Sequence, residues 1–168
     1  CETLAHAQGR GATILAEVVG YGSSAVGKAP NGDFLKQSFV NALKAALGDA
    51  DPRSVGHIHA HGLGTQESDR QEAEAIREVF GQPSDQPPVT TAKGHMGNLG
   101  AGGGMVELLA SLKSLNGDLF AIKNLSELDA ACPINACMQN GIPAGDSFIN
   151  VNITPQGQAS ATRIQAFA

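Results

Sequence analysis

The chain has 168 residues, of which 21 are glycine, and its 16 acidic and 11 basic residues give a net charge of −5 at pH 7. This acidic balance argues against a general nucleic-acid-binding protein, and no apolar run approaches the roughly 18 residues that a membrane-spanning helix needs. No secretory signal pattern opens the sequence, and its three cysteines, Cys1, Cys132 and Cys137, are odd in number. We therefore expect reduced thiols, a cytoplasmic location, and one domain or one half of a larger one.

Strand and helix patterns alternate through the middle of the chain, and strands dominate its end. The predicted elements are a strand at 12–19 broken by the glycines that follow, an exposed loop at 27–32, a helix at 33–48, a strand at 55–60, a helix at 68–80, a strand at 89–92, a helix between the glycines at 102–104 and Asn116, and strands at 119–123, 148–153 and 162–167. This order predicts an α/β fold, layered α/β/α, in which helices cover a mixed sheet. We expect residues 1–168 to form a single domain.

All three predicted helices have apolar residues at helical spacing, among them Leu35, Phe39 and Leu43 in the first and Ala73, Ile76 and Phe80 in the second. In the helix at 33–48, Asp33 is a suitable N-cap because its carboxylate can accept hydrogen bonds from the amides of the first turn, and Gly48 ends the helix. The last helix has apolar residues three and four positions apart, which predicts that this face points inward. Its members are Met105, Leu108, Leu109, Leu112 and Leu115.

Three of the five histidines lie close together, at His57, His59 and His61. On a strand, residues two apart point to the same face. Neutral imidazoles are good zinc ligands, so one hypothesis is a metal-binding module. The alternative is that these histidines have ordinary hydrogen-bond partners. His61 stands just before the Gly-rich turn at 62–64, at the edge where α/β proteins place their ligands.

A second Gly-rich segment runs from Thr91 to Gly104 and contains Lys93, His95 and Asn98. Its glycine spacing is that of neither a dinucleotide-binding turn nor a phosphate-binding loop. Small residues at 100–104 instead allow the following helix to enter a crowded core. We expect Lys93, which closely follows a strand, to pair with the carboxylate of Glu72.

These two segments carry a resemblance. The first reads His61-Gly62-Leu63-Gly64-Thr65 followed by Asp69, Glu72 and Ala73, and the second reads Lys93-Gly94-His95-Met96-Gly97-Asn98 followed by small residues. Together they resemble the signatures of β-ketoacyl synthases. The resemblance extends over nearly the whole chain, and it implies a thiolase-like fold of which this chain is the C-terminal half.

The resemblance also implies roles for single residues. Members of the family transfer an acyl group from an acyl carrier protein to a cysteine and condense it with a decarboxylated malonyl unit. His61 matches a hydrogen-bond donor to the thioester oxygen, and Thr65 matches a hydroxyl that contacts the pantetheine arm. Lys93 and Glu72 match an ion pair behind the site. Asn98 takes the position of the family's second histidine, while His95 stands where the family usually has Asn.

The resemblance implies as partners an acyl carrier protein and the missing N-terminal half, within a homodimer or a heterodimer. It implies no metal and no bound cofactor. None of the three cysteines matches the family's nucleophile, so the isolated chain is expected to be inactive. Leu63 replaces a Thr of the signature, and residues 152–160 lack most glycines of the family's late turn. A non-catalytic, degenerate partner subunit is therefore the second hypothesis within the family.

Overall fold

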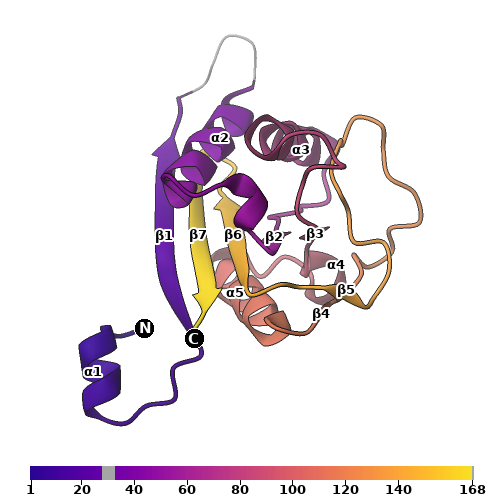
Figure 1. The fold of residues 1–168 in the computed structure, drawn as a ribbon. Helices are drawn as coiled ribbons and strands as arrows, with labels where there is room; N and C mark the ends of the chain where they lie inside the picture. Colours follow the sequence, from indigo (N-terminus) through magenta and orange to yellow (C-terminus); the bar gives the residue numbers. More distant parts are fainter. Residues whose placement is uncertain (28–32, 168) are drawn as a thin grey trace.

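The computed structural model describes residues 1–27 and 33–167, so most of the loop predicted at 27–32 lies outside the described residues. Its centre is a five-stranded sheet with the strand order β1-β7-β6-β2-β3 (Figure 1). The strands are β1 (Ala16–Ala25), β2 (His57–His59), β3 (Val89–Thr90), β6 (Ser147–Ile153) and β7 (Gln158–Ala166). β7 is antiparallel to β1 and β6, whereas β2 is parallel to β6 and β3. The sheet is therefore mixed, as predicted.

Helices pack on both faces of this sheet. α2 (Phe34–Leu47) and α3 (Gln66–Phe80) form the main apolar core with Ile58 of β2 and other strand residues. α5 (Gly103–Ser114) packs against β2 and β6. Because side chains alternate along a strand, Ile58 faces the core under α2 and α3, while its neighbours His57 and His59 face α5. These layers confirm the predicted α/β/α class.

Short elements connect these layers. They are α1 (Leu4–Gly9), the 3-10 turns η1 (Pro52–Ser54) and η2 (Gly100–Gly102), α4 (Lys93–Met96), and a two-stranded sheet of β4 (Asp118–Leu119) and β5 (Ile142–Pro143). The strand predicted at 119–123 is thus shorter than expected, and the segment that follows it is the long loop drawn in orange beside α3 (Figure 1). Among the described residues, no helix is long and apolar enough to cross a membrane.

The predicted end of the first strand at Gly20 is wrong. β1 continues through Gly20 and Gly22 to Ala25, paired with β7 throughout, with a register shift between Val18 and Gly20. The glycines are needed because α2 lies directly on them. A Cβ on Gly20 would lie 2.1 Å from the carbonyl oxygen of Ala46, and one on Gly22 would lie 2.1 Å from that of Ala42. Here glycine permits close approach of a helix rather than a turn.

The predicted orientation of the last helix is also wrong. The buried face of α5 consists of Gly103, Glu107, Ser111 and Ser114, at helical spacing. Met105 and Leu109, which were expected to point inward, are 60% and 52% exposed. The side of the sheet beneath α5 carries polar groups, so the helix turns its small and polar residues toward them. On its apolar side Met105 and Leu109 are left exposed, while Leu108, Leu112 and Leu115 are half-buried.

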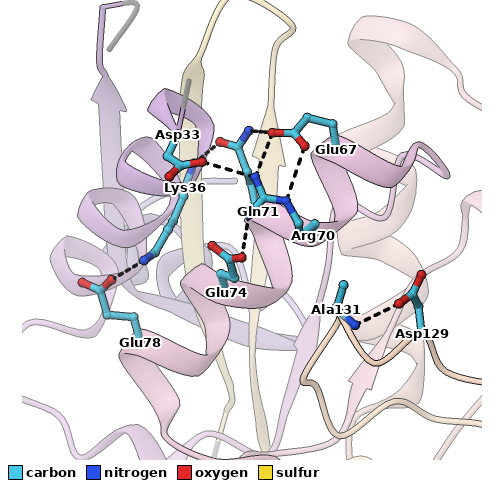
Figure 2. A network of polar contacts seen from close by, with 9 residues as sticks. All are labelled: Asp33, Lys36, Glu67, Arg70, Gln71, Glu74, Glu78, Asp129 and Ala131. Carbon is cyan, nitrogen blue, oxygen red and sulfur yellow. Dashed lines mark hydrogen bonds and ion pairs between the residues drawn. The ribbon is translucent and has the colours of Figure 1, made fainter. Parts of the chain in front are cut away.

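A network of charges ties α2 to α3 (Figure 2). Arg70 of α3 contacts Asp33 at 3.2 Å, Glu67 at 2.9 Å and Glu74 at 2.6 Å. Asp33 stands at the N-cap position as predicted, but within the described chain its side chain accepts no amide of the first turn and contacts Arg70 instead. The hydrogen bonds from Arg70 to these carboxylates raise its pKa. The start of α2 is thereby fixed to the first turns of α3.

Candidate functional site

His61 lies just after β2, in a turn that α3 holds in place. The carboxylate of Glu72 accepts hydrogen bonds from the amides of His61 at 2.7 Å and Gly62 at 2.9 Å. The carboxylate of Asp69 accepts from the amide of Gly64 at 3.1 Å. Gly62 has a φ of +51°, and a Cβ there would lie 2.6 Å from Oγ1 of Thr91. Two carboxylates of α3 therefore determine the path of the backbone at His61.

Lys93 contacts this turn from the other side, at the start of α4. Its Nζ donates to the carbonyl oxygen of His61 at 2.6 Å and to Nδ1 of the same residue at 3.2 Å. The same Nζ forms an ion pair with Oε1 of Glu107 in α5. Lys93 is 8% exposed and Glu107 is fully buried. All three contacts lie within one small region behind the His61 ring.

The expected pairing of Lys93 with Glu72 is therefore wrong. The partner of Lys93 is Glu107, and both oxygens of Glu72 are used by backbone amides. Burial raises the pKa of Glu72 to about 7, and the two backbone hydrogen bonds act in the opposite direction. Burial likewise raises the pKa of Glu107, while Lys93 lowers it. Glu72 supports the backbone of the site, and Glu107 neutralises its cation.

The contacts of His61 determine which ring nitrogen carries the proton. An ammonium group has donors and no acceptor, so Nδ1 accepts from Lys93 and the neutral ring carries its proton on Nε2. Burial, followed by the charge of Lys93, lowers the pKa of His61 to about 4, while a hydrogen bond with the side chain of Asn152 acts in the opposite direction. At neutral pH, His61 is therefore an uncharged hydrogen-bond donor.

A cavity of about 760 Å³ opens in front of His61. His61, Thr65 and Asn98 all line it, so the structure brings together three of the five residues singled out from the sequence. Asn152 and the turn at 153–156 line it as well. Of the other two, Lys93 touches His61 from behind, and Glu72 lines a separate cavity of about 660 Å³ between α3 and the loop at 122–134.

Asn98 and His95 differ in their surroundings. Asn98 is exposed, and its Oδ1 accepts from the amide of Gly100 at 3.0 Å, so its NH₂ group is the part that can serve a ligand. Nε2 of His95 lies 3.0 Å from the carbonyl oxygen of Ala121, and its ring packs edge-on against Phe120. His95 therefore points toward the loop after β4 and not toward His61.

Two residues of this region were not identified from the sequence. Glu107 is the one charged residue in the run Met105–Leu112, and a lone carboxylate in an apolar stretch is a signal for a buried ion pair. Asn152 lies among apolar residues at the end of β6, where it reaches His61. The sequence pattern of β6 alone gives no indication that Asn152 faces the cavity.

The histidine cluster does not have the arrangement of a metal site. Both ring nitrogens of His57 and of His59 are within hydrogen-bond distance of protein atoms: Ala144 O, Ser111 Oγ and the amide of Ala92. In residues 1–27 and 33–167, no group of three or more histidines, cysteines and acidic residues could hold a metal ion. The structure therefore gives the metal-binding hypothesis no ligand set among these residues.

The three cysteines are free thiols, and none of them lines the cavity at His61. Cys132 lines the cavity behind α3, and Cys137 is buried. Burial raises the pKa of Cys137 to about 11, so at neutral pH it is a thiol and not the nucleophilic thiolate.

Comparison with known proteins gives three findings. A family model described as "Beta-ketoacyl synthase, C-terminal domain" matches residues 15–123. The chain is 36% identical over 119 residues to 3-oxoacyl-[acyl-carrier-protein] synthase 2 of Staphylococcus aureus, an alignment that covers 66% of this chain and 28% of the relative. The aligned part of the chain thus spans less than a third of the length of that relative.

Two solved structures have the same fold. The ishigamide ketosynthase/chain length factor superposes with a TM-score of 0.88 at 24% identity, covering 99% of this chain and 42% of that one. A chain of the AntDE:AntF complex, described as a type II polyketide synthase acyl-carrier protein in complex with its ketosynthase, has a TM-score of 0.86 at 25% identity, covering 99% of this chain and 42% of that one. Both likenesses support the predicted ketosynthase-like fold.

Proposed function

The chain belongs to the β-ketoacyl synthase family, and from this premise we propose that it is the C-terminal half of a protein that condenses acyl and malonyl thioesters in fatty-acid or polyketide synthesis. One observation carries the proposal. His61 presents an uncharged imidazole to a cavity of about 760 Å³, with its proton fixed on Nε2 by the ammonium group of Lys93. Residues 1–168 then form one domain of that protein.

The chemistry explains why a neutral imidazole suits this site. When a malonyl thioester loses carbon dioxide, the electron pair of the broken bond moves toward the thioester oxygen, which becomes an enolate. Donors placed at that oxygen stabilise the charge as it develops. Nε2–H of His61 is one such donor. The NH₂ groups of Asn98 and Asn152, which line the same cavity, are candidates for the second.

Lys93 and Glu107 then act behind the reacting atoms. The enolate carbon attacks an acyl thioester held on a cysteine, and the sulfur leaves as a thiolate. During this sequence His61 keeps its proton, because Lys93 occupies Nδ1 and the low pKa of the ring disfavours a second proton. Glu107 balances the charge of Lys93 within the protein interior. His61, Lys93 and Asn98 are therefore the proposed catalytic group, with Glu72 supporting the turn.

The nucleophilic cysteine is proposed to lie outside this chain. None of Cys1, Cys132 and Cys137 lines the cavity that contains His61. The chain also leaves apolar surface uncovered on the α5 side of the sheet, at Met105, Leu109 and Tyr21, the last of which is 79% exposed. We propose that the N-terminal half covers this surface and supplies the cysteine. The isolated chain is then inactive.

Thr65 and the carrier protein belong to the same proposal. Thr65 stands at the N-cap position of α3, yet within the described residues its hydroxyl caps no amide of that helix. Thr65 lines the cavity, and we propose that its hydroxyl contacts a pantetheine arm there. One related ketosynthase is described in complex with its acyl-carrier protein, and another is a ketosynthase/chain length factor. We propose an acyl carrier protein as partner and a homodimer or heterodimer as the assembly.

A second function within the family rests on a different observation. Asn98 lacks the imidazole that the resemblance expects at this position, and its Oδ1 is bound to Gly100. The turn after β6, residues 154–157, keeps a single glycine. If the site of the full-length protein is impaired in this way, that protein acts as a non-catalytic partner subunit that shapes the assembly.

An intact-mass and product assay on the full-length protein separates these functions. The protein is given acyl- and malonyl-carrier thioesters. An acyl adduct followed by a product two carbons longer supports condensation. An adduct without extension indicates that Asn98 fails as second donor, and Asn98→His should then restore extension. Absence of any adduct supports the non-catalytic subunit and rejects the synthase.

A further inference from the structure

Two buried histidines and a buried serine form a chain of hydrogen bonds beneath α5. Oγ of Ser111 lies 2.9 Å from Nε2 of His57 and 2.7 Å from Nδ1 of His59. Nδ1 of His57 lies 2.8 Å from the carbonyl oxygen of Ala144, and the amide of Ala92 donates to Nε2 of His59 at 3.2 Å. All three side chains are fully buried. Four hydrogen bonds thus join four separate segments of the chain.

The partners at the two ends determine which atom carries each proton in this chain of bonds. A carbonyl oxygen only accepts, so Nδ1 of His57 carries a proton and its Nε2 accepts from Ser111. A backbone amide only donates, so Nε2 of His59 accepts and its Nδ1–H donates to Ser111. Ser111 therefore receives one bond and gives one. Both rings are neutral Nδ1–H tautomers, and every donor has one acceptor.

The Ala92 end of this chain of bonds and its central member Ser111 lie next to Lys93 and Glu107, the ion pair behind His61. Ala92 directly precedes Lys93 in the backbone, and Ser111 lies one helical turn after Glu107 in α5. His59, between them, stands on β2, which leads directly to His61. The chain of bonds therefore connects the three segments that carry His61, Lys93 and Glu107.

We propose that His59 and Ser111, with His57, are positioning residues that hold Lys93 and Glu107 in register behind His61. This inference rests on the proposed function, since it assigns these residues a role in the same site. None of the three lines the cavity or touches the reacting atoms. Their effect passes through the backbone at Ala92 and through the placement of α5 on β2. A shift of about 1 Å in a positioning contact lowers a rate by about a hundredfold.

The aromatic neighbours fix the two rings further. His57 stacks on Phe148 with ring centroids 5.1 Å apart, and His59 meets the edge of Phe120 at 6.1 Å. Rotation of either ring would break its hydrogen bond to the backbone. The orientation of the rings is therefore set by packing as well as by hydrogen bonds.

The first test needs no activity. The full-length protein is labelled with ¹⁵N in its histidine rings and studied by solid-state NMR, alongside its Ser111→Ala and Ser114→Ala variants. Ser114 lies on the same buried face of α5 but takes no part in the chain of bonds, so it is the matched control. Signals changed by Ser111→Ala and not by Ser114→Ala belong to the affected rings. We expect the signals of His57 and His59 to be among those that change, and in the wild type both rings to be Nδ1–H tautomers. His61 is expected to be the Nε2–H tautomer. An Nε2–H tautomer at His57 or His59 overturns the proposal.

The second test measures condensation in the same variants. Ser111→Ala should lower kcat about tenfold to a hundredfold with KM nearly unchanged, and Ser114→Ala should change neither. Equal kinetics of the two variants, with the wild type active, overturn the positioning role alone. If the wild type itself condenses nothing, the proposed function fails. The His61 signal then decides the positioning role. If the chain of hydrogen bonds holds Lys93 in place, Ser111→Ala shifts the His61 signal, and an unchanged signal overturns the inference.

Discussion

The ammonium group of Lys93 and the carboxylate of Glu107 form an ion pair with both side chains almost completely removed from solvent. Such a pair gains attraction in the protein interior, but each charge also loses its hydration. Removing one member of the pair therefore affects stability differently from removing both members. The pair also connects α4 to α5 across the site.

We expect Lys93→Met to lower the free energy of unfolding by about 3–5 kcal/mol, because it leaves the carboxylate of Glu107 buried without its cation. The double variant Lys93→Met/Glu107→Met should lose less than the sum of the single variants. Urea unfolding of the full-length protein measures both. Lys44→Met, which removes an exposed contact with Glu78 of 3.6 Å, is the control and should change stability by less than about 1 kcal/mol. Equal effects at Lys93 and Lys44 would contradict the buried pair.

The donor role of His61 predicts a large kinetic effect. His61→Ala in the full-length protein should lower the rate of malonyl decarboxylation and condensation by about 10²–10³-fold, as expected when one oxyanion donor is removed. His95→Ala is the matched control, because that ring contacts Ala121 and not the cavity. A steady-state assay with carrier-bound thioesters compares the two. Comparable losses in both variants would show that His61 has no special place in the reaction.

The buried His59 predicts a dependence of stability on pH. Burial lowers its pKa to about 3 in the folded protein, from 6.5 in the unfolded chain. Between these two pH values the unfolded chain binds one proton more than the folded protein. The contribution of the neutral His59 to the free energy of unfolding is therefore complete above pH 6.5 and decreases as the pH falls toward 3. The contribution to the slope is up to ~1.4 kcal/mol per pH unit.

We therefore expect the stability of His59→Asn and of His59→Gln to fall less steeply than that of the wild type between pH 6.5 and pH 5, by up to that amount. Glu72, whose raised pKa acts in the opposite direction, is present in all three proteins and cancels from the comparison. Urea unfolding at several pH values gives the slopes. Parallel curves for the wild type and both variants would be inconsistent with a neutral buried His59.

The contact between β1 and α2 predicts a steric effect. Gly22→Ala places a Cβ 2.1 Å from the carbonyl oxygen of Ala42, so strand and helix must separate, and we expect a loss of about 1–3 kcal/mol or more. Gly27→Ala is the control, because its Cβ would have no heavy atom within 4 Å; it should be neutral or stabilise by about 0.4–1 kcal/mol. Thermal unfolding of both variants measures the difference. A stable Gly22→Ala protein would contradict the close approach.

The sequence predicted the family, from its two motifs, and the fold class. It also predicted that α2 and α3 are helices, because their apolar spacing and caps are local signals. It did not predict the orientation of α5. An apolar stripe indicates that a face is covered, but here the polar residues Glu107 and Ser111 face the sheet, where Lys93, His57 and His59 receive them. Two residues of the apolar stripe, Met105 and Leu109, remain exposed. A pattern within one helix does not identify which neighbour each face meets.

The partner of Lys93 was missed for a related reason. Glu72 stands in the signature beside His61, whereas Glu107 is separated from Lys93 by a glycine-rich turn and the first turn of α5. The choice between them depends on the backbone amides of His61 and Gly62, which occupy Glu72. Backbone hydrogen bonds of a turn are not encoded in side-chain spacing. In contrast, His61, Thr65 and Asn98, each singled out by its place in a motif, line one cavity, and their roles there stay predictions.

The approach of α2 to β1 also limits how related sequences can diverge. The atoms nearest to a Cβ on Gly20 or Gly22 are main-chain carbonyl oxygens of α2, and no side-chain replacement in the helix can remove them. A larger residue in the strand is admissible only together with a displacement of the whole helix, and α2 is anchored through Asp33 to α3 and its turn at His61. Substitutions at these two glycines are therefore coupled to the geometry of the distant site at His61. We expect few substitutions at these positions in related sequences, although neither glycine lines the cavity at His61.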